Sequence, residues 1–338
     1  MTTSQGTVTM GDVARLAGVS KMTVSNVINN RAGVSEPVRR RVMEVVRESG
    51  YRLNVSARTL RSGRTGVLGL AVPHVNSSYF GLLAEHVIDE AARRGFHVAI
   101  EQTGAAAEGE FEAIAQSHKL QFDGLILSAS GLDPRDQRLV TGGIPMAMLG
   151  ERDFAANFDH VAMPNEEGTK AATEHLVDRG CRRIAIVTGA LRDDVDVVTR
   201  RHRGYLAALK ERGMTADPAL RETLDAMNAE GARRAAHRMA DSGLDFDGVV
   251  AVTDEVARGL LRGFADRGVR VPENVRLIGF DDVSESRLMV PSLSTVSPDH
   301  RWMAAKAVEL VAARIEDPAR PAAEHTAPFT IAVRESTG

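Results

Sequence analysis

The chain has 338 residues, of which 26% are charged and 43% hydrophobic, with 42 Lys and Arg against 45 Asp and Glu. This length suits two or three domains, and the apolar content suffices for packed cores, so a disordered chain is excluded. The single cysteine, Cys181, excludes an internal disulfide and a multi-cysteine metal site. The N-terminus lacks a basic-then-apolar leader, and the uncharged stretch 66–84 is too polar for a membrane span, so we expect a cytoplasmic protein.

The net charge of −3 conceals an asymmetry along the chain. Residues 1–64 contain eleven Lys and Arg against four acids, a net of +7, whereas the remaining residues carry a net of −10. A basic segment attached to an acidic body indicates that the basic segment meets a polyanion. A merely solvated basic surface is the alternative that charge alone leaves open.

The basic segment is predicted to form short helices separated by caps and turns. Thr9 and Asp12 have capping-box spacing and open a helix over Met10–Ala17, with Val13, Leu16 and Ala17 inward. After a Gly-Val turn, Ser20 caps a second helix from Lys21 to about Asn29. Ser35 caps a third helix, which has Pro37 in its first turn and ends before Gly50.

Two short helices joined by a glycine turn are typical of a helix-turn-helix, whose second helix enters the DNA major groove. The outward side chains there are Lys21, Met22 and Asn26, which suit guanine, a thymine methyl and adenine respectively. Short hydroxyl and amide donors predicted to contact phosphates are Ser20, Thr23, Ser25 and Asn29. A small helical bundle with ordinary caps is the alternative.

The motifs in this region resemble the N-terminus of LacI/GalR-family transcriptional regulators. They are D-V-A-x-x-A-G-V-S, T-V-S-x-V-I-N, a third helix ending at G-Y, and N-x-x-A-R-x-L, in order and without gaps. One departure is Asn26, where the family often has Arg or His, so the operator preference need not follow familiar members.

The resemblance implies that residues 54–64 form a hinge helix and linker that order on operator DNA. In this family pattern Asn54 and Arg58 contact phosphates, while Ala57 and Leu60 lie in the minor groove. An apolar wedge such as Leu60 unstacks a base step and kinks the duplex. A linker residue packed on its neighbours is the alternative for Leu60.

From Gly66 onward, apolar runs alternate with amphipathic helical stretches, an order that predicts parallel sheets covered by helices. The predicted strands are 67–72, 96–101, 124–127, 145–149, 184–187, 249–252 and 275–280. The predicted helices include 79–94, 166–179, 203–212 and 256–267. Phe122-Asp123-Gly124 is echoed by Phe246-Asp247-Gly248, as expected for two similar α/β lobes.

This body resembles the family's effector-binding core, which has the fold of periplasmic sugar-binding proteins. The resemblance rests on Ile278-Gly279-Phe280-Asp281-Asp282, on residues 291–296 and on the C-terminal VRESTG. The fold class is therefore α/β, with a helix-turn-helix head (1–53), a hinge (54–64) and a two-lobed core (65–338). The family's three lobe crossings are placed near 160–165, 290–295 and 325, which gives lobe 1 as about 65–162 and 296–325, and lobe 2 as about 163–295 and 326–338.

A ligand cleft between the lobes is implied, at the carboxyl ends of the strands. The family pattern, carried over residue by residue, places five residues in it: Tyr79, Phe80, Arg201, Thr253 and Asp281. Core packing is an equal alternative for Phe80, and a solvated charge is the alternative for Arg201 and Asp281.

The chain departs from its family at cleft positions, which leaves the effector open. Ala226 stands where familiar members have a stacking aromatic, Thr253-Asp254 replaces Asn-Asp, and Pro164-Asn165 replaces Asp-Asn. A sugar-like compound, a sugar acid, a phosphorylated sugar or a nucleoside remains possible. An acidic run, Asp193, Asp194 and Asp196, is interpreted as solvated, with cation or amine recognition as the minor alternative.

No hydrolase, metalloprotease, P-loop or dinucleotide motif occurs, so we expect no enzyme, cofactor or metal. The expected function is a ligand-responsive repressor that binds a pseudo-palindromic operator as a homodimer, because no leucine-heptad tail follows the core. A solute-binding protein without regulation is the rival class. Induction versus corepression, and the regulated genes, cannot be read from the sequence.

Overall fold

A computed structural model describes residues 8–28, 32–51, 63–133, 143–150, 158–191 and 196–338. The chain divides into two compact units, Met1–Thr65 and Gly66–Gly338. The boundary falls next to the predicted start of the core.

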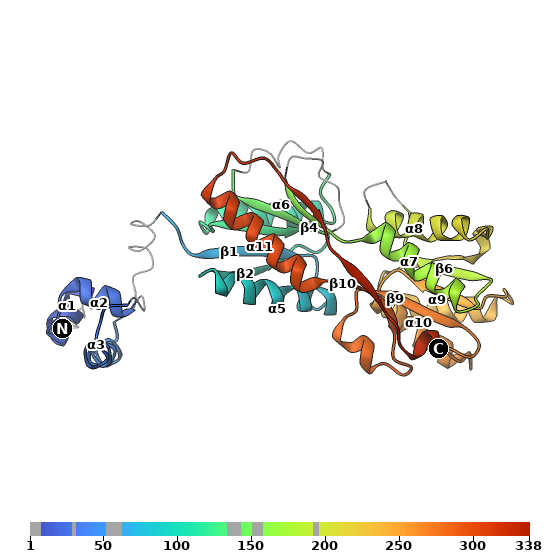
Figure 1. The fold of residues 1–338 in the computed structure, drawn as a ribbon, viewed down its shortest axis with the longest axis horizontal. Coiled ribbons are helices and arrows are strands. Elements are labelled where there is room, and N and C mark those ends of the chain that lie inside the picture. Colours follow the sequence, from blue (N-terminus) through green and yellow to red (C-terminus); the bar gives the residue numbers. More distant parts are fainter. Residues whose placement is uncertain (1–7, 29–31, 52–62, 134–142, 151–157, 192–195) are drawn as a thin grey trace, which may run out of the picture. The chain divides into compact units, whose positions relative to one another are not determined.

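Within its described residues the first unit contains three helices (Figure 1). They enclose a small valine-rich core. Their bounds are α1 Met10–Ala17, α2 Lys21–Ile28 and α3 Glu36–Ser49. Val13, Val24 and Val42, one from each helix, have no exposed surface. A core this small leaves most of each helix at the surface, so most of the basic side chains remain exposed.

Caps fix the ends of these helices as the sequence predicts. The Thr9 hydroxyl accepts from the Asp12 amide, and the Asp12 carboxylate accepts from the Thr9 amide at 3.0 Å. Hydrogen bonds from Thr9 and then from Arg15 lower the pKa of Asp12 to about 2. A lowered carboxyl pKa contributes stability that is present at neutral pH and is lost as the pH falls from the ordinary carboxyl value towards about 2. Ser20 Oγ accepts from the Thr23 amide at 3.0 Å and caps α2.

Two details of the head differ from the prediction. Leu16 is 62% exposed, while Ala14 is buried in its place. At 100° per residue, Leu16 lies on the opposite side of Val13 from Ala17 and Ala14, so it falls outside the buried stripe. Ser35 stands at the N-cap of α3 but makes no side-chain capping hydrogen bond.

The described part of the second unit contains two six-stranded sheets, each the centre of one lobe (Figure 1). The first sheet has the order β11-β5-β4-β3-β1-β2 and the second β12-β10-β9-β8-β6-β7. The first sheet comprises β1 Val67–Val72, β2 His97–Gln102, β3 Gly124–Ser128, β4 Met146–Gly150, β5 Asp159–Ala162 and β11 Glu324–Thr326. The second comprises β6 Ile184–Thr188, β7 Arg221–Thr223, β8 Gly248–Ala251, β9 Arg276–Phe280, β10 Ser294–Pro298 and β12 Phe329–Ala332. All described pairs are parallel except β10 with β12.

Helices cover both faces of each sheet, which explains why the central strands are apolar on both sides. Around the first sheet these are α5 Ser78–Arg93, α6 Ala107–Lys119 and α11 His300–Glu316. Around the second they are α7 Asn165–Asp178, α8 Val197–Glu211, α9 Ala229–Asp241 and α10 Asp254–Asp266. None of the helices in the described part of the chain is long and apolar enough to cross a membrane.

The sequence echo between the lobes has a structural cause. Asp123, just before β3, accepts from the Gly66 amide just before β1 at 2.8 Å. Asp247, just before β8, accepts from the amides of Arg182 and Arg183 just before β6, at 2.7 and 2.9 Å. Each aspartate therefore ties the starts of two neighbouring parallel strands, and the two lobes are built alike at this point.

The second lobe crossing differs from its predicted place near 290–295. Residues 294–298 form β10, which pairs with β9 inside the second sheet, so the chain leaves that lobe only after Pro298. The turn residues 291–292 resemble a linker, but they belong to a loop that returns to the same sheet. The other two crossings lie between β5 and α7 and between β11 and β12, close to the predicted positions.

The close packing of α7 on α8 depends on Gly204, and substitution there should destabilise the protein. A Cβ at Gly204 would lie 2.2 Å from the carbonyl oxygen of Glu166, whereas a Cβ at Gly81 in α5 would meet nothing within 4 Å. We expect Gly204→Ala to cost about 1–3 kcal/mol in urea unfolding, because the helices must move apart. Gly81→Ala should be neutral or stabilising by up to about 1 kcal/mol, and equal effects would contradict this account.

Candidate functional site

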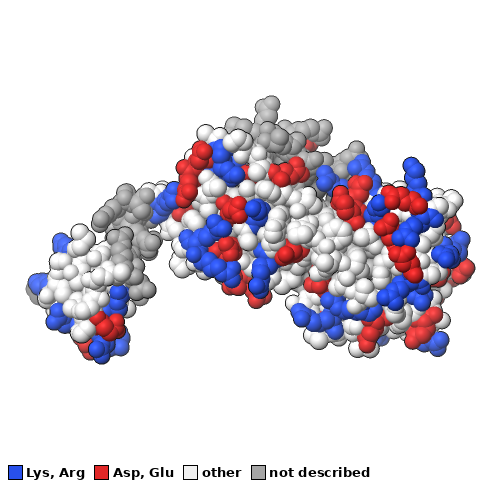
Figure 2. All heavy atoms as spheres, in the orientation of Figure 1, with Lys and Arg blue, Asp and Glu red and all other residues white. Residues whose placement is uncertain are grey.

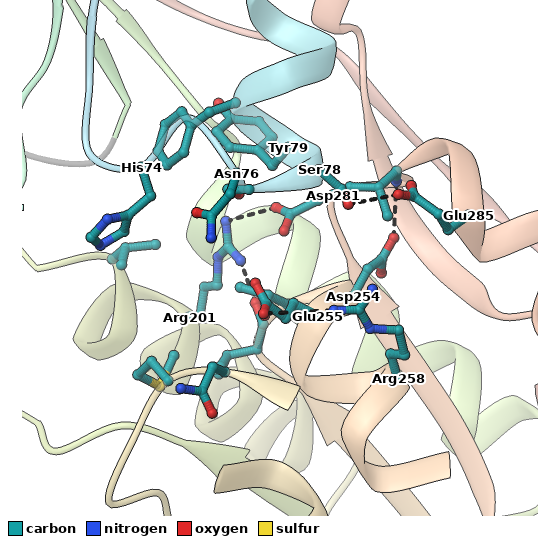
Figure 3. A pocket seen from close by; sticks show the side chains of 18 of the residues that line it. His74, Asn76, Ser78, Tyr79, Arg201, Asp254, Glu255, Arg258, Asp281 and Glu285 are labelled. Carbon is teal, nitrogen blue, oxygen red and sulfur yellow. Dashed lines mark hydrogen bonds and ion pairs between the residues drawn. The ribbon is translucent and has the colours of Figure 1, made fainter. Parts of the chain in front are cut away.

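A cavity of about 600 Å³ lies in the second unit between the two lobes (Figure 3). Lobe 1 contributes the β1–α5 loop and the start of α5, and lobe 2 contributes residues from α8, α10 and the loops after β7, β8 and β9. All five residues predicted for the cleft line it: Tyr79, Phe80, Arg201, Thr253 and Asp281. The volume is in the range of small-molecule sites.

Arg201 on α8 is the largest buried side chain here, with 2% of its surface exposed. Its Nε donates to Asn165 Oδ1 at 2.9 Å, and its Nη1 donates to the carbonyl oxygen of Val252. Its Nη2 lies 3.5 Å from Asp281 Oδ1, and the guanidinium stacks 3.6 Å from the Phe280 ring centroid. A solvated charge is therefore the wrong interpretation of Arg201.

Asp281 is the acid that compensates this buried cation, and it is itself only 6% exposed. Its backbone has φ 119°, a region that non-glycine residues adopt only under strain. Strain of this kind persists where the surroundings hold the backbone, and such positions cluster at ligand sites. Asp281 comes directly after β9, and Figure 3 shows its carboxylate directed at Arg201.

The two aromatic residues sit at the start of α5. Tyr79 is 9% exposed, and its ring packs edge-on against Phe80, with centroids 4.8 Å apart. Phe80 lines the cavity and also packs against the hydrophobic core, so core packing holds for it and its contact with an effector stays a prediction. Thr253 has a helix-capping contact, since its Oγ1 accepts from the Val256 amide at 3.2 Å.

Asp254, the first residue of α10, is fully buried beside the cavity. Its carboxylate accepts from Ser286 Oγ and Thr295 Oγ1, both at 2.6 Å, and from the Val283 amide at 3.1 Å. Burial outweighs these hydrogen bonds and raises the pKa of Asp254 to about 7. A Cβ at Gly279 would lie 2.2 Å from Asp254 Oδ1, so the buried acid requires glycine there.

Several lining residues carry no sequence signal, because only the fold brings them together. Ser78 of lobe 1 donates to Glu285 Oε1 of lobe 2 at 2.7 Å, which joins the lobes beside the cavity (Figure 3). Arg258 lies 3.7 Å from Glu255 one turn earlier on α10. The other lining side chains that sequence reasoning missed include His74, Asn76, Met227, Asn228 and Met289. Met227 follows Ala226, which stands where familiar members of the family have a stacking aromatic. The Met227 side chain supplies an apolar part of the cavity wall.

The helix-turn-helix leaves its predicted base-contact residues at the surface. Lys21 and Met22 are exposed, Met22 by 68%, and Asn26 is partly exposed. Lys21 extends over the first helix, since a Cβ at Gly11 would lie 3.0 Å from its Cε. Among the predicted phosphate contacts, Ser20, Thr23 and Ser25 are at least partly exposed. Five predicted DNA-contact residues lie outside the described residues: Asn29, Asn54, Ala57, Arg58 and Leu60.

The acidic run is only partly within the described residues. Asp193 and Asp194 lie outside them, and Asp196 caps α8 by accepting from the Val198 amide at 3.3 Å. Within the residues that the structure describes, no group of three or more His, Cys, Asp or Glu side chains is placed to hold a metal ion.

A helix-turn-helix unit and a two-lobed α/β unit with a cavity between its lobes, joined in one chain, define a class of ligand-responsive DNA-binding regulators. Residues 9–54 match the bacterial regulatory proteins of the lacI family, and residues 173–337 match a periplasmic binding protein-like domain.

Relatives of similar length are transcriptional regulators of the same class. The chain is 32% identical to the transcriptional regulator GalS of Salmonella typhimurium, over 90% of this chain and 88% of the relative. It is 29% identical to a ribose operon repressor of Halalkalibacterium halodurans, over 97% of both. A structure described as a LacI-family transcriptional regulator, from Sanguibacter keddieii, is 39% identical, with a TM-score of 0.75 over 82% of this chain and 100% of that one. The chain belongs to the LacI family, and it is a transcriptional regulator, not an enzyme.

The burial of Arg201 predicts that its removal destabilises the fold as well as the cavity. Arg201→Ala removes the buried cation that Asp281 faces and breaks a buried ion pair, and we expect a loss of about 3–5 kcal/mol in urea unfolding. Arg258→Ala removes an ion pair whose partners are 49% and 43% exposed, and it should cost at most about 1 kcal/mol. Similar losses for the two variants would show that Arg201 is not structurally required.

Proposed function

We propose that this regulator represses transcription as a homodimer on a pseudo-palindromic operator, and that a small polar compound in the cavity alters its DNA affinity. The observation that carries the proposal is the joining of an exposed helix-turn-helix surface to a cavity lined by both lobes of the second unit. A dimer supplies two such surfaces, one for each half-site.

In the DNA complex we assign base contacts to Lys21, Met22 and Asn26. Their exposure on α2 supports this assignment, because the N-terminal side chains of a recognition helix reach base edges. Phosphate contacts are assigned to Ser20, Thr23, Ser25, Asn29, Asn54 and Arg58. The proposed minor-groove residues of the hinge are Ala57 and Leu60.

The effector site is assigned to Tyr79, Phe80, Arg201, Thr253 and Asp281. A compound bound there contacts lobe 1 and lobe 2 of one chain. When these two lobes close on it, the distance between the two copies of lobe 1 in the dimer changes. That spacing favours or opposes pairing of the hinge segments, so effector and operator affinities are linked reciprocally.

The charge balance of the cavity favours a neutral hydroxylated effector over a sugar acid or a phosphorylated sugar. Both guanidinium groups that line the cavity face carboxylates, Arg201 facing Asp281 at 3.5 Å and Arg258 facing Glu255 at 3.7 Å. Two further lining carboxyls, Asp254 and Glu285, belong to the same wall. An anionic compound would meet an excess of acids among the described residues, whereas hydroxyl groups can donate to carboxylates and accept from guanidinium groups.

Figure 2 shows basic and acidic side chains interspersed on the visible face of the second unit, and the whole chain's surplus of basic residues lies in the first 64. This distribution supports contact of the first unit with DNA. We place the protein in the cytoplasm, associated with the nucleoid.

DNA binding is tested by selecting duplexes from a random pool with the full chain and titrating the selected site. We expect affinity to fall by about a thousandfold or more between about 50 and 200 mM salt, because phosphate contacts release counterions. Asn26→Ala should relax base preference at one position of each half-site, by about 1–3 kcal/mol.

Gln116→Ala, an exposed position on α6, serves as the matched control and should leave affinity unchanged. Binding that does not depend on salt, or no selected sequence, would contradict the repressor proposal and favour a solute-binding protein.

The effector class is tested by thermal unfolding with D-ribose, D-galactose and cellobiose against gluconate, ribose 5-phosphate and adenosine. At a hundredfold excess over Kd, a neutral sugar that binds should raise the midpoint by about 5–10 °C. Asn76→Ala removes an exposed lining amide, so it should abolish the shift without lowering the unliganded midpoint. A shift with the acid or the phosphate alone would refute the neutral class.

A further inference from the structure

His300 lies where the chain enters lobe 1 after its second crossing, as the first residue of α11. The residue is 7% exposed, and α11 packs against α5 and the first sheet. Its ring meets the Tyr79 ring edge-on, with centroids 5.6 Å apart. On its other side it reaches lobe 2, where Nε2 contacts the backbone carbonyl oxygen of Asp281. One buried imidazole thus contacts both an aromatic and an acidic residue of the cavity.

The contact with Asp281 fixes the protonation of the ring. A carbonyl oxygen can only accept, so Nε2 carries the proton and donates it. Nδ1 is buried and has no hydrogen-bond partner among the described residues. Placing a second proton on Nδ1 would create a buried cation with an unsatisfied donor, which is costly. His300 is therefore neutral, with Nε2–H as its tautomer.

The surroundings agree with a neutral ring. Burial is the largest influence and lowers the pKa of His300 below its ordinary value. The hydrogen bond to the Asp281 carbonyl acts against burial and raises the pKa, as do the carboxylates of Asp282 and Asp299, while His86 on α5 lowers it further. Because the lowered pKa belongs to the folded state, the stability that His300 contributes is present above the ordinary histidine pKa and is lost as the pH falls below it.

Asp281 needs such support, because its backbone is strained at φ 119°. Three contacts hold it: its amide donates to the Val296 carbonyl at 3.0 Å, its carbonyl accepts from His300, and its carboxylate faces Arg201 at 3.5 Å. Of these three partners, only His300 belongs to a helix that packs on lobe 1.

We propose that His300 is a positioning residue of the effector cleft, whose Nε2–H holds the strained backbone of Asp281 and ties this lobe 2 acid to the helix that enters lobe 1. The importance of the position for effector binding rests on the proposed function, whereas the contact itself does not. The orientation of Asp281 then depends on where the chain crosses into lobe 1 at α11. A change in the angle between the lobes is therefore transmitted to Asp281 through the His300 side chain.

Two variants of the full chain separate this role from simple packing. His300→Gln keeps a donor near the position of Nε2 but removes the ring, and His300→Phe keeps the ring against Tyr79 but removes the donor. We expect the Phe variant to unfold about 5 °C lower than the unsubstituted protein, because the buried hydrogen bond from Nε2 to the Asp281 carbonyl is lost. The Gln variant should stay within about 2 °C. The reverse order would show that His300 acts only by packing, and would overturn the proposal.

The link to strain is tested in an Asp281→Gly background, where glycine adopts the positive φ freely. There the Phe substitution should cost less than half of the loss that it causes in the unsubstituted protein. An equal cost in both backgrounds would show that His300 does not support the Asp281 backbone.

The tautomer gives an independent signature. In protein labelled with ¹⁵N at its ten histidines, one imidazole, missing from both variants, should keep the neutral Nε2–H form to a lower pH than an ordinary histidine does. Titration of that ring with an ordinary histidine pKa would overturn the proposal. None of these measurements uses an effector or DNA, so their failure is distinguishable from failure of the repressor assignment.

Discussion

The cavity is organised around the burial of one guanidinium group, that of Arg201. A cation removed from water is tolerated only where a counter-charge and several acceptors surround it. The structure supplies them from separate elements: Asn165 at the start of α7, the Val252 carbonyl after β8, and Asp281 after β9. Because Arg201 needs all of these partners, the ends of α7, β8 and β9 meet around it and form the wall of the cleft. The backbone of Asp281 is strained for the same reason, because this conformation turns its carboxylate toward Arg201.

The neighbouring acid, Asp254, shows that burial has different consequences for a carboxyl group held by neutral hydrogen-bond donors. Three hydrogen-bond donors surround it, yet desolvation dominates and the pKa rises to about 7. The two acids of the same wall therefore have different partners. Asp281 has a cation to face, while Asp254 accepts hydrogen bonds and joins α10, the β9 loop and β10.

The sequence predicted most of the central architecture because buried strands and amphipathic helices leave periodic patterns. The strand 67–72 and the helix Met10–Ala17 were confirmed to the residue. Edge strands such as Arg221–Thr223 and Glu324–Thr326 were missed, since they are short and polar and form only by pairing with a strand already in place. Arg201 and Asp281 could be placed in the cleft by family motifs, whereas Ser78 and Glu285 could not, because they are 207 residues apart and meet only when the lobes are folded.

The contact between Ser78 and Glu285 also bears on how fast a compound can exchange with the cavity. It is an exposed hydrogen bond between the two lobes, and water can replace it, so breaking it costs about 1 kcal/mol. A barrier of that size slows opening by less than tenfold, since each 1.4 kcal/mol corresponds to about one factor of ten. The hydrogen bond between Ser78 and Glu285 therefore does not by itself hold the two lobes together around a bound compound.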